Sequence, residues 1–148
     1  MMTTASLYET DLYAWAIQHA QLLRERRIDE LDFEHLAEEI ESVGASERRE
    51  LQNRLEVLLA HLLKLHFLTQ LRGQNERGWK ATIREQRKRI RQCLKENPSL
   101  QPKIVDILID AYDYAIDTII KQTNVDENLF PSSCPYELEQ ILNDDFYP

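Results

Sequence analysis

The segment from Asp32 to Thr69 limits the possible folds of this chain more than any other, because its apolar residues recur at helical spacing. These residues are Leu36, Ile40, Val43, Leu51, Leu55, Leu58, Leu62 and Leu65. At about 100° per residue they fall on one stripe, and the phase is kept across the gap at Gly44 and Ala45. The pattern predicts one long helix over about residues 32–70, or two nearly collinear helices with a kink near Gly44.

The rest of the chain also favours helices. The 148 residues include only 3 glycines and 5 prolines, and alternating β-branched runs are almost absent. Apolar periodicity and capping signals predict further helices over about 6–26, 76–96 and 99–123, with a short one over about 135–142. Gly73 and Asn75 indicate a turn over 71–75 that ends the long helix.

The expected fold is therefore all-α, a helical bundle of four main helices organised along one long helix (about 32–70), plus a short C-terminal helix. No linker is long enough to separate two domains, so we expect a single α-helical domain over 1–148. No run approaches 18 apolar residues, and the start lacks the features of a secretory signal. Cys93 and Cys134 are far apart and most simply reduced, so we expect a cytoplasmic location and no membrane contact.

The net charge of −8 is unevenly distributed. Residues 72–95 hold nine Lys/Arg against two Glu (+7), residues 104–148 hold one Lys against ten Asp/Glu (−9), and residues 29–50 hold two Arg against nine Asp/Glu (−7). One interpretation is internal complementarity, in which the basic helix packs beside the acidic segments. The other is a surface that meets an anionic partner.

A nucleic acid is one such partner, bound through Arg84, Lys88 and Arg91 of the basic helix 76–96. The acidic balance, with an isoelectric point near 5.0, weighs against it. No recognition-helix motif accompanies the basic residues, so nucleic-acid binding is the less favoured reading.

Motifs of the common enzyme classes are missing. The sequence has no P-loop, dinucleotide fingerprint, G-x-S-x-G or H-E-x-x-H motif. His35 and Glu39 have i,i+4 spacing, but His61 lies 26 residues beyond His35, about 39 Å along a continuous helix. His35, Glu39 and His61 are therefore weak metal ligands that need a hairpin at Gly44 or a second subunit, and no metal or cofactor is favoured.

Polar residues interrupt two apolar stripes. Glu47, Arg54 and His61 are spaced by seven on the long helix, and Gln86 and Arg87 occupy the apolar stripe of the basic helix. Because buried charge is costly unless it is paired, we expect some of these residues to meet.

The most natural ion pair among them joins Glu47 and Arg87, with Trp79 bordering the cluster. One interpretation is a structural network that fixes helix register. The functional alternative is a small pocket for an anionic group, with Arg54 and Arg87 as donors and His61 as a titrating partner.

A set of motifs in fixed order carries a family resemblance. They are DLYAWA, LDFEHLAEEIESVG, SERRELQNRL, HLLKLHF, GWKATIREQR, NPSL, CPYELEQIL and DFYP. The chain resembles the domain of unknown function family 29, which is common in cyanobacteria and other bacteria. The resemblance implies a small α-helical protein over nearly the whole chain and no established activity.

The resemblance also marks recurring signature positions. They match Trp15, Glu39, Glu47, Arg54, His61, Trp79 and Arg87. His66 stands where an aromatic residue is usual, which discounts it as a ligand.

The favoured function is protein–protein interaction or homo-oligomerisation without enzymatic activity. A long helix that outreaches its neighbours leaves apolar stripe uncovered, and a second subunit or a protein partner can cover it. The alternatives are a small hydrolase or metal-binding enzyme around Glu47, His61 and Arg87, and nucleic-acid binding through helix 76–96.

Overall fold

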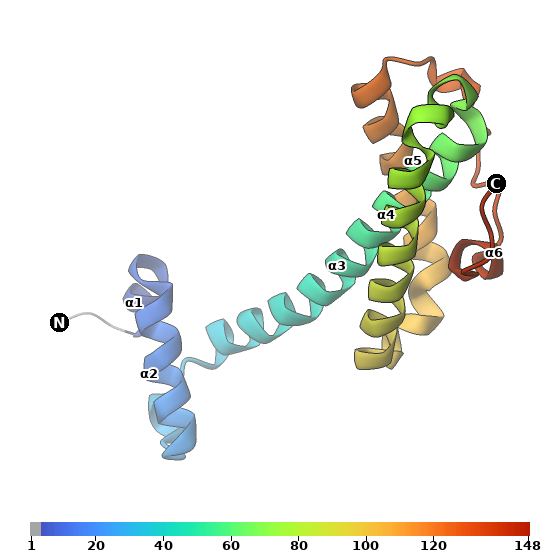
Figure 1. The fold of residues 1–148 in the computed structure, drawn as a ribbon. Helices are drawn as coiled ribbons and strands as arrows, with labels where there is room; N and C mark the ends of the chain where they lie inside the picture. Colours follow the sequence, from blue (N-terminus) through green and yellow to red (C-terminus); the bar gives the residue numbers. More distant parts are fainter. Residues whose placement is uncertain (1–3) are drawn as a thin grey trace. The chain divides into compact units, whose positions relative to one another are not determined.

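A computed structural model describes the backbone of residues 4–148 and the side chains from Leu7 onward. The helices are α1 (Thr4–Thr10), α2 (Leu12–Arg24), α3 (Phe33–Phe67), α4 (Thr69–Glu96), α5 (Ile104–Thr123) and α6 (Leu138–Leu142) (Figure 1). Short 3-10 turns lie at η1 (Ile28–Glu30), η2 (Pro98–Lys103) and η3 (Glu127–Leu129). The described residues form no strand, and the all-α prediction is confirmed.

In the described part of the chain, no helix is both long enough and apolar enough to cross a membrane.

The prediction of one long helix is confirmed. Helix α3 contains 35 residues, and Gly44 lies inside it. Its start is set by Asp32, whose side-chain Oδ1 accepts the His35 backbone N–H at 3.2 Å.

The turn expected over 71–75 is wrong. Helix α3 ends at Phe67, and Leu68 makes the break with φ −98° and ψ 57° before α4 begins at Thr69. Gly73 does not adopt the positive φ that a glycine helix stop requires. Asn75 donates its side-chain amide to the Leu71 carbonyl one turn earlier at 2.7 Å, so both residues lie within regular helix.

The first predicted helix is interrupted. Asp11 separates α1 from α2 and caps α2 by accepting the Ala14 backbone N–H at 3.0 Å. Arg26 then takes a left-handed φ of 58°, which ends the helical segment. The predicted helix over 99–123 likewise begins with the 3-10 turn η2, and only the part from Ile104 is α-helical.

The chain divides into two compact units, an N-terminal unit of residues 1–46 and a C-terminal unit of residues 47–148. The two units share helix α3, so the single domain expected over 1–148 stays a prediction.

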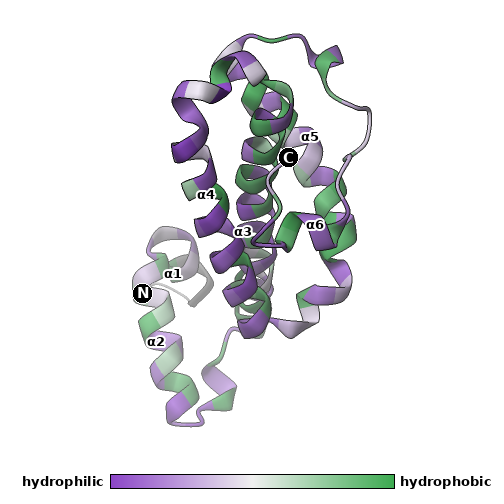
Figure 2. Cartoon of the chain, turned by 45° about the vertical axis from the view of Figure 1, so that its right-hand side comes forward, coloured by the Kyte–Doolittle hydropathy of each residue, from purple (hydrophilic) through white to green (hydrophobic). Residues whose placement is uncertain are grey.

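The C-terminal unit contains the large core. Leucines of α3, isoleucines of α4 and α5, and aromatic residues of the segment after α5 fill it. Fully buried examples are Leu55, Leu58, Ile90 and Ile119. In Figure 2 most residues of α4 carry the hydrophilic colour, so this helix contributes few apolar residues to the core.

The N-terminal unit has a small core of its own. Trp15, His19 and Leu22 of α2 are its buried residues. The Trp15 and His19 rings stack with centroids 4.4 Å apart, and Tyr8 meets Trp15 edge-on at 4.8 Å. Aromatic contacts thus replace the leucine packing of the larger unit.

Candidate functional site

Arg87 of α4 is fully buried and binds the C-terminal segment of the chain. Its Nε donates to the Ile141 carbonyl at 2.7 Å, and its Nη2 donates to the Phe146 carbonyl at 2.8 Å. The Tyr147 ring lies 5.3 Å from the guanidinium carbon. Burial lowers the pKa of Arg87. The ion pair expected between Arg87 and Glu47 is wrong, because Arg87 meets main-chain carbonyls instead of a carboxylate.

Some of the other predicted cluster residues do meet. Arg54 Nη1 donates to the Gln86 side-chain oxygen at 3.3 Å and Arg54 Nη2 donates to Glu50 at 2.9 Å. Glu47 accepts a long hydrogen bond of 3.4 Å from the Asn97 side chain. Glu47 and Arg54 line one depression of about 120 Å³, together with Glu50, Arg89, Gln92, Cys93 and Glu96. With three carboxylates against two guanidinium groups, this depression does not favour an anion.

His61 lies away from these residues. It is 14 positions beyond Glu47 on the same helix, about 21 Å along the axis. Its Nδ1 donates to the Val57 carbonyl one turn earlier at 2.8 Å, and burial lowers its pKa. Glu47, His61 and Arg87 therefore do not share one site within the chain, which removes the geometry that the enzyme alternative needs.

Trp79 instead borders Lys64, a residue that the periodicity argument did not single out. Lys64 is 7% exposed, donates to the Gln122 side chain at 2.7 Å, and has its Nζ 5.9 Å from the Trp79 ring centroid. Burial lowers the pKa of Lys64. The sequence does mark this residue, because Lys64 lies inside the apolar run LLKLHF, where a buried lysine is expected.

The basic helix α4 carries a stripe of exposed cations on its outer face. Arg77, Arg84, Lys88 and Lys95 are exposed, and among the described residues none of them forms an ion pair. Of the α4 cations, Arg91 alone pairs with an acidic residue of another segment among the described residues, with Asp144 at 3.0 Å. The other ion pairs that α4 forms in this part of the chain lie within the helix itself.

His35 and Glu39, the weak metal candidates, belong to a network in the N-terminal unit. Tyr8 donates to the Glu39 carboxylate at 2.6 Å and stacks on the His35 ring at 3.9 Å between centroids. His35 Nδ1 lies 2.5 Å from the Asp32 carboxylate. Each candidate ligand therefore already has a protein partner.

The charges in this network reinforce one another. The hydrogen bond to Asp32 raises the pKa of His35, and the hydrogen bond to His35 lowers the pKa of Asp32. The hydrogen bond to Glu39 raises the pKa of Tyr8 to about 12. In the described part of the chain, no three His, Cys, Asp or Glu side chains lie close enough to hold a metal ion.

Buried His19 completes the network. Its Nε2 accepts the Asp32 backbone N–H at 3.0 Å, and its Nδ1 lies 3.2 Å from the Trp15 carbonyl. The tautomer with hydrogen on Nδ1 satisfies both contacts. His19 therefore joins helix α2 to the start of α3.

Comparison with known proteins identifies the family of this chain. The family model "Domain of unknown function DUF29" matches residues 7–147, nearly the whole chain. The chain belongs to this family. No curated protein and no solved structure matches it.

In this DUF29 chain, most of the large hydrophobic residues that the described part exposes lie in the N-terminal unit. Of fourteen large hydrophobic residues exposed in the described chain, eight fall within residues 7–46. They are Leu12, Tyr13, Ile17, Leu23, Ile28, Phe33, Ile40 and Val43. The much larger C-terminal unit supplies only six, so the apolar residues of the N-terminal unit mark a candidate interaction surface.

The first half of α3 is the clearest part of this surface. Leu51, Leu55 and Leu58 are fully buried, yet Ile40 is 70% exposed and Val43 is 65% exposed. These five residues belong to the same helical stripe. The sequence pattern predicts this stripe correctly, but it does not reveal which part of it the chain itself covers.

Proposed function

We propose that this DUF29 protein acts by protein–protein interaction and that its partner at the apolar surface of the N-terminal unit is a second copy of the same chain. The observation that carries the proposal is the exposure of Ile40 and Val43 on a stripe that is buried from Leu51 onward. Burying a side chain of this size contributes roughly 1.5–3 kcal/mol, so a partner that covers both gains several kcal/mol before the cost of association.

Charges on the same helix support a second copy over an unrelated protein. Among the described residues, Arg48 and Arg49 have no ion-pair partner, and neither do Glu34 and Glu41 nearer the start of α3. An antiparallel copy that crosses near Gly44 brings Arg48 and Arg49 of one chain towards the acidic first turns of α3 in the other. Such pairing is the isologous contact on which most homodimers are built.

Gly44 and Ala45 favour a close approach at the middle of this segment. A Cβ added to Gly44 would meet no atom within 4 Å, so the space beside Gly44 is free. Small residues at a helix crossing let two backbones come near each other and allow the flanking apolar side chains to interdigitate.

Sedimentation velocity over a range of concentrations tests the proposal. The wild-type protein is expected to show a concentration-dependent mass above the 17.5 kDa of one chain. The double variant Ile40→Glu/Val43→Glu is expected to sediment as a monomer at the same concentrations. A wild-type protein that stays monomeric throughout contradicts the proposal.

The matched control is Ile109→Glu in the C-terminal unit. Ile109 is 62% exposed, close to the 70% of Ile40, and lies on α5, which belongs to the C-terminal unit. Ile109→Glu should keep the wild-type mass, and equal dissociation by both variants would mean that the charge itself, and not this surface, opposes association.

A further inference from the structure

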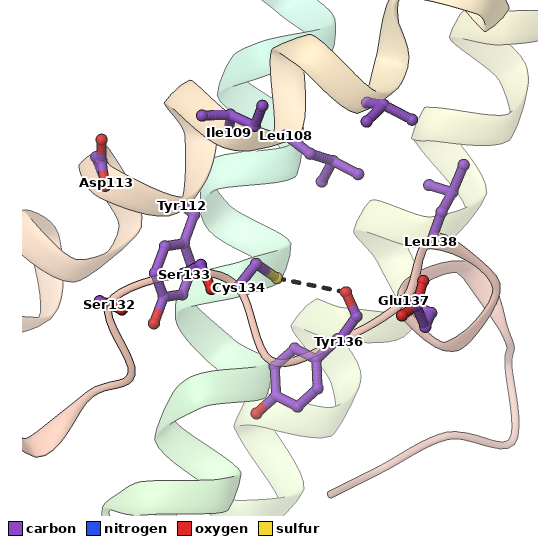
Figure 3. A pocket seen from close by; sticks show the side chains of 11 residues that line it. Leu108, Ile109, Tyr112, Asp113, Ser132, Ser133, Cys134, Tyr136, Glu137 and Leu138 are labelled. Atoms are coloured by element: carbon purple, nitrogen blue, oxygen red, sulfur yellow. Dashed lines mark hydrogen bonds between the residues drawn. The ribbon is translucent and has the colours of Figure 1, made fainter.

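The C-terminal unit contains a pocket of about 410 Å³ that neither the family nor the self-association proposal explains. Helix α5 supplies one wall through Val105, Leu108, Ile109, Tyr112 and Asp113, and the loop before α6 supplies the other. Figure 3 shows the side chains of both walls. The Cys134 thiol donates a hydrogen bond to the Tyr136 carbonyl. The volume falls in the usual range for small-molecule sites.

The walls are mostly apolar, and hydrogen bonds fix two of the lining side chains in place. Tyr112 is almost fully buried, and its hydroxyl donates to the Pro131 carbonyl at 2.6 Å, which holds the loop against α5. Tyr136 is anchored from the other side, with its hydroxyl 2.9 Å from His66 Nδ1. Two lining tyrosines are therefore held by hydrogen bonds to other parts of the C-terminal unit.

The charged side chains that line the pocket are all acidic. Burial raises the pKa of Tyr112 to about 12 and raises the pKa of Cys134, so the phenol and the thiol are neutral near pH 7. Asp113 and Glu137 are the charged lining residues, and no lysine or arginine lines the pocket.

Asp113 is the free carboxylate of the two. Glu137 is engaged in the capping box at the start of α6, whereas Asp113 has no hydrogen-bond or ion-pair partner among the described residues. Asp106, Asp110 and Asp117 share its exposed face of α5, so the local field attracts cations and repels anions.

We propose that this pocket binds a small organic cation, an amine carried on an apolar or aromatic body. The apolar body packs against Leu108, Leu138 and the tyrosine rings, and the ammonium group pairs with Asp113. Tyrosine faces add cation–π attraction where the amine lies over them. The site lies wholly within the C-terminal unit and does not depend on self-association.

A matched series of probes tests the charge requirement on the full chain. We would titrate 4-phenylbutylamine, 4-phenylbutanol and 4-phenylbutanoate by calorimetry or by NMR chemical shifts. The amine is expected to bind about fivefold more tightly than the alcohol, with the carboxylate weakest. Equal affinities, or no binding of the amine at millimolar concentrations, would overturn the proposal.

Variants of Asp113 test whether its carboxylate is the group that pairs with the amine. Asp113→Asn should weaken the affinity for the amine about fivefold and leave the affinity for the alcohol unchanged. Asp113→Glu should restore most of the lost affinity for the amine. Asp106→Asn is the control, since Asp106 is exposed on the same face of α5 but does not line the pocket. An amine affinity that is the same in Asp113→Asn and in wild type contradicts the assignment.

Thiol labelling locates the bound amine. Asp113 also lines a neighbouring depression, which Cys134 does not. In a Cys93→Ala background, saturating amine is expected to slow the reaction of Cys134 with N-ethylmaleimide several-fold. Unchanged labelling at saturation would place the amine outside this pocket and refute the proposal.

Discussion

The Arg87 Nε donates to the Ile141 carbonyl oxygen at 2.7 Å, across 54 residues of sequence. A second nitrogen of the same guanidinium reaches the carbonyls of Gln140 and Phe146. The last carbonyls of a helix have no partner within it, so Arg87 satisfies the end of α6 and the segment that follows. A single buried cation on α4 thus holds the C-terminal segment of the chain to the core.

Replacing Arg87 by Met should lower the free energy of unfolding by about 3 kcal/mol, because several buried carbonyls lose their donor. Arg87→Lys should also be strongly destabilising, since an ammonium group cannot form the same fork of hydrogen bonds. Urea denaturation measures both changes. Arg84→Met, at an exposed position of the same helix, is the control and should stay within about 0.5 kcal/mol of wild type.

The Asp32–His35 pair should make the N-terminal unit sensitive to pH. Its hydrogen bond raises the pKa of His35 above the ordinary 6.5, with Glu38 and Glu9 adding to the rise. A raised histidine pKa adds stability that is fully present below pH 6.5. This contribution is lost as the pH rises through the raised pKa. The lowered pKa of Asp32 adds stability that is lost only in acid, as the pH falls through that lowered value.

NMR titration of the histidine side chains tests this directly. His35 should titrate above 6.5, and Asp32→Asn should return it towards that value. His61 provides an internal comparison, because burial lowers its pKa and it should titrate below 6.5. Titration of His35 and His61 at the same pH would contradict both assignments.

The buried Lys64 side chain should lower the free energy of unfolding near neutral pH. Burial lowers its pKa, so between that lowered value and 10.5 the unfolded chain holds more protons and stability rises with pH. Lys64→Met removes the buried cation while keeping the volume of the side chain. We expect the free energy of unfolding at pH 7 to rise by about 1 kcal/mol.

The same substitution at exposed Lys88 is the control for a general charge effect. Lys88→Met should leave the unfolding free energy within about 0.5 kcal/mol of wild type. A loss of stability in Lys64→Met would show that the hydrogen bond to Gln122 and the contact with Trp79 outweigh the cost of burying the charge.

The sequence predicts what depends on local periodicity and misses what depends on distant partners. The stripe through Leu51 and Leu58 locates α3 because each residue repeats the same spacing. The periodicity also identifies Arg87 as a polar residue on an apolar face. Its true partners are main-chain carbonyls at the end of α6 and in the segment that follows, more than 50 residues away, and no side-chain pattern marks them. Side-chain patterns alone point to Glu47 as the partner, because main-chain carbonyls leave no mark in the sequence.

The misplaced turn at residues 71–75 has a different origin. Glycine and asparagine are common at helix ends, but their presence does not require one, since both residues also adopt right-handed helical angles. The actual break falls at Leu68, a buried residue that fits the core between α3 and α4. Tertiary packing, which the local signals do not contain, decided where the helix ends.

Gly73→Ala distinguishes the two placements of this turn. In a left-handed helix stop, alanine would be strained and the variant would lose stability. Inside α4, a Cβ on Gly73 meets no atom within 4 Å, so alanine should raise the free energy of unfolding by about 0.5–1 kcal/mol. Gly78→Ala, farther along the same helix and equally open, should give a gain of similar size. Urea denaturation of both variants gives the comparison, and a loss at Gly73 beside a gain at Gly78 would return the turn to residues 71–75.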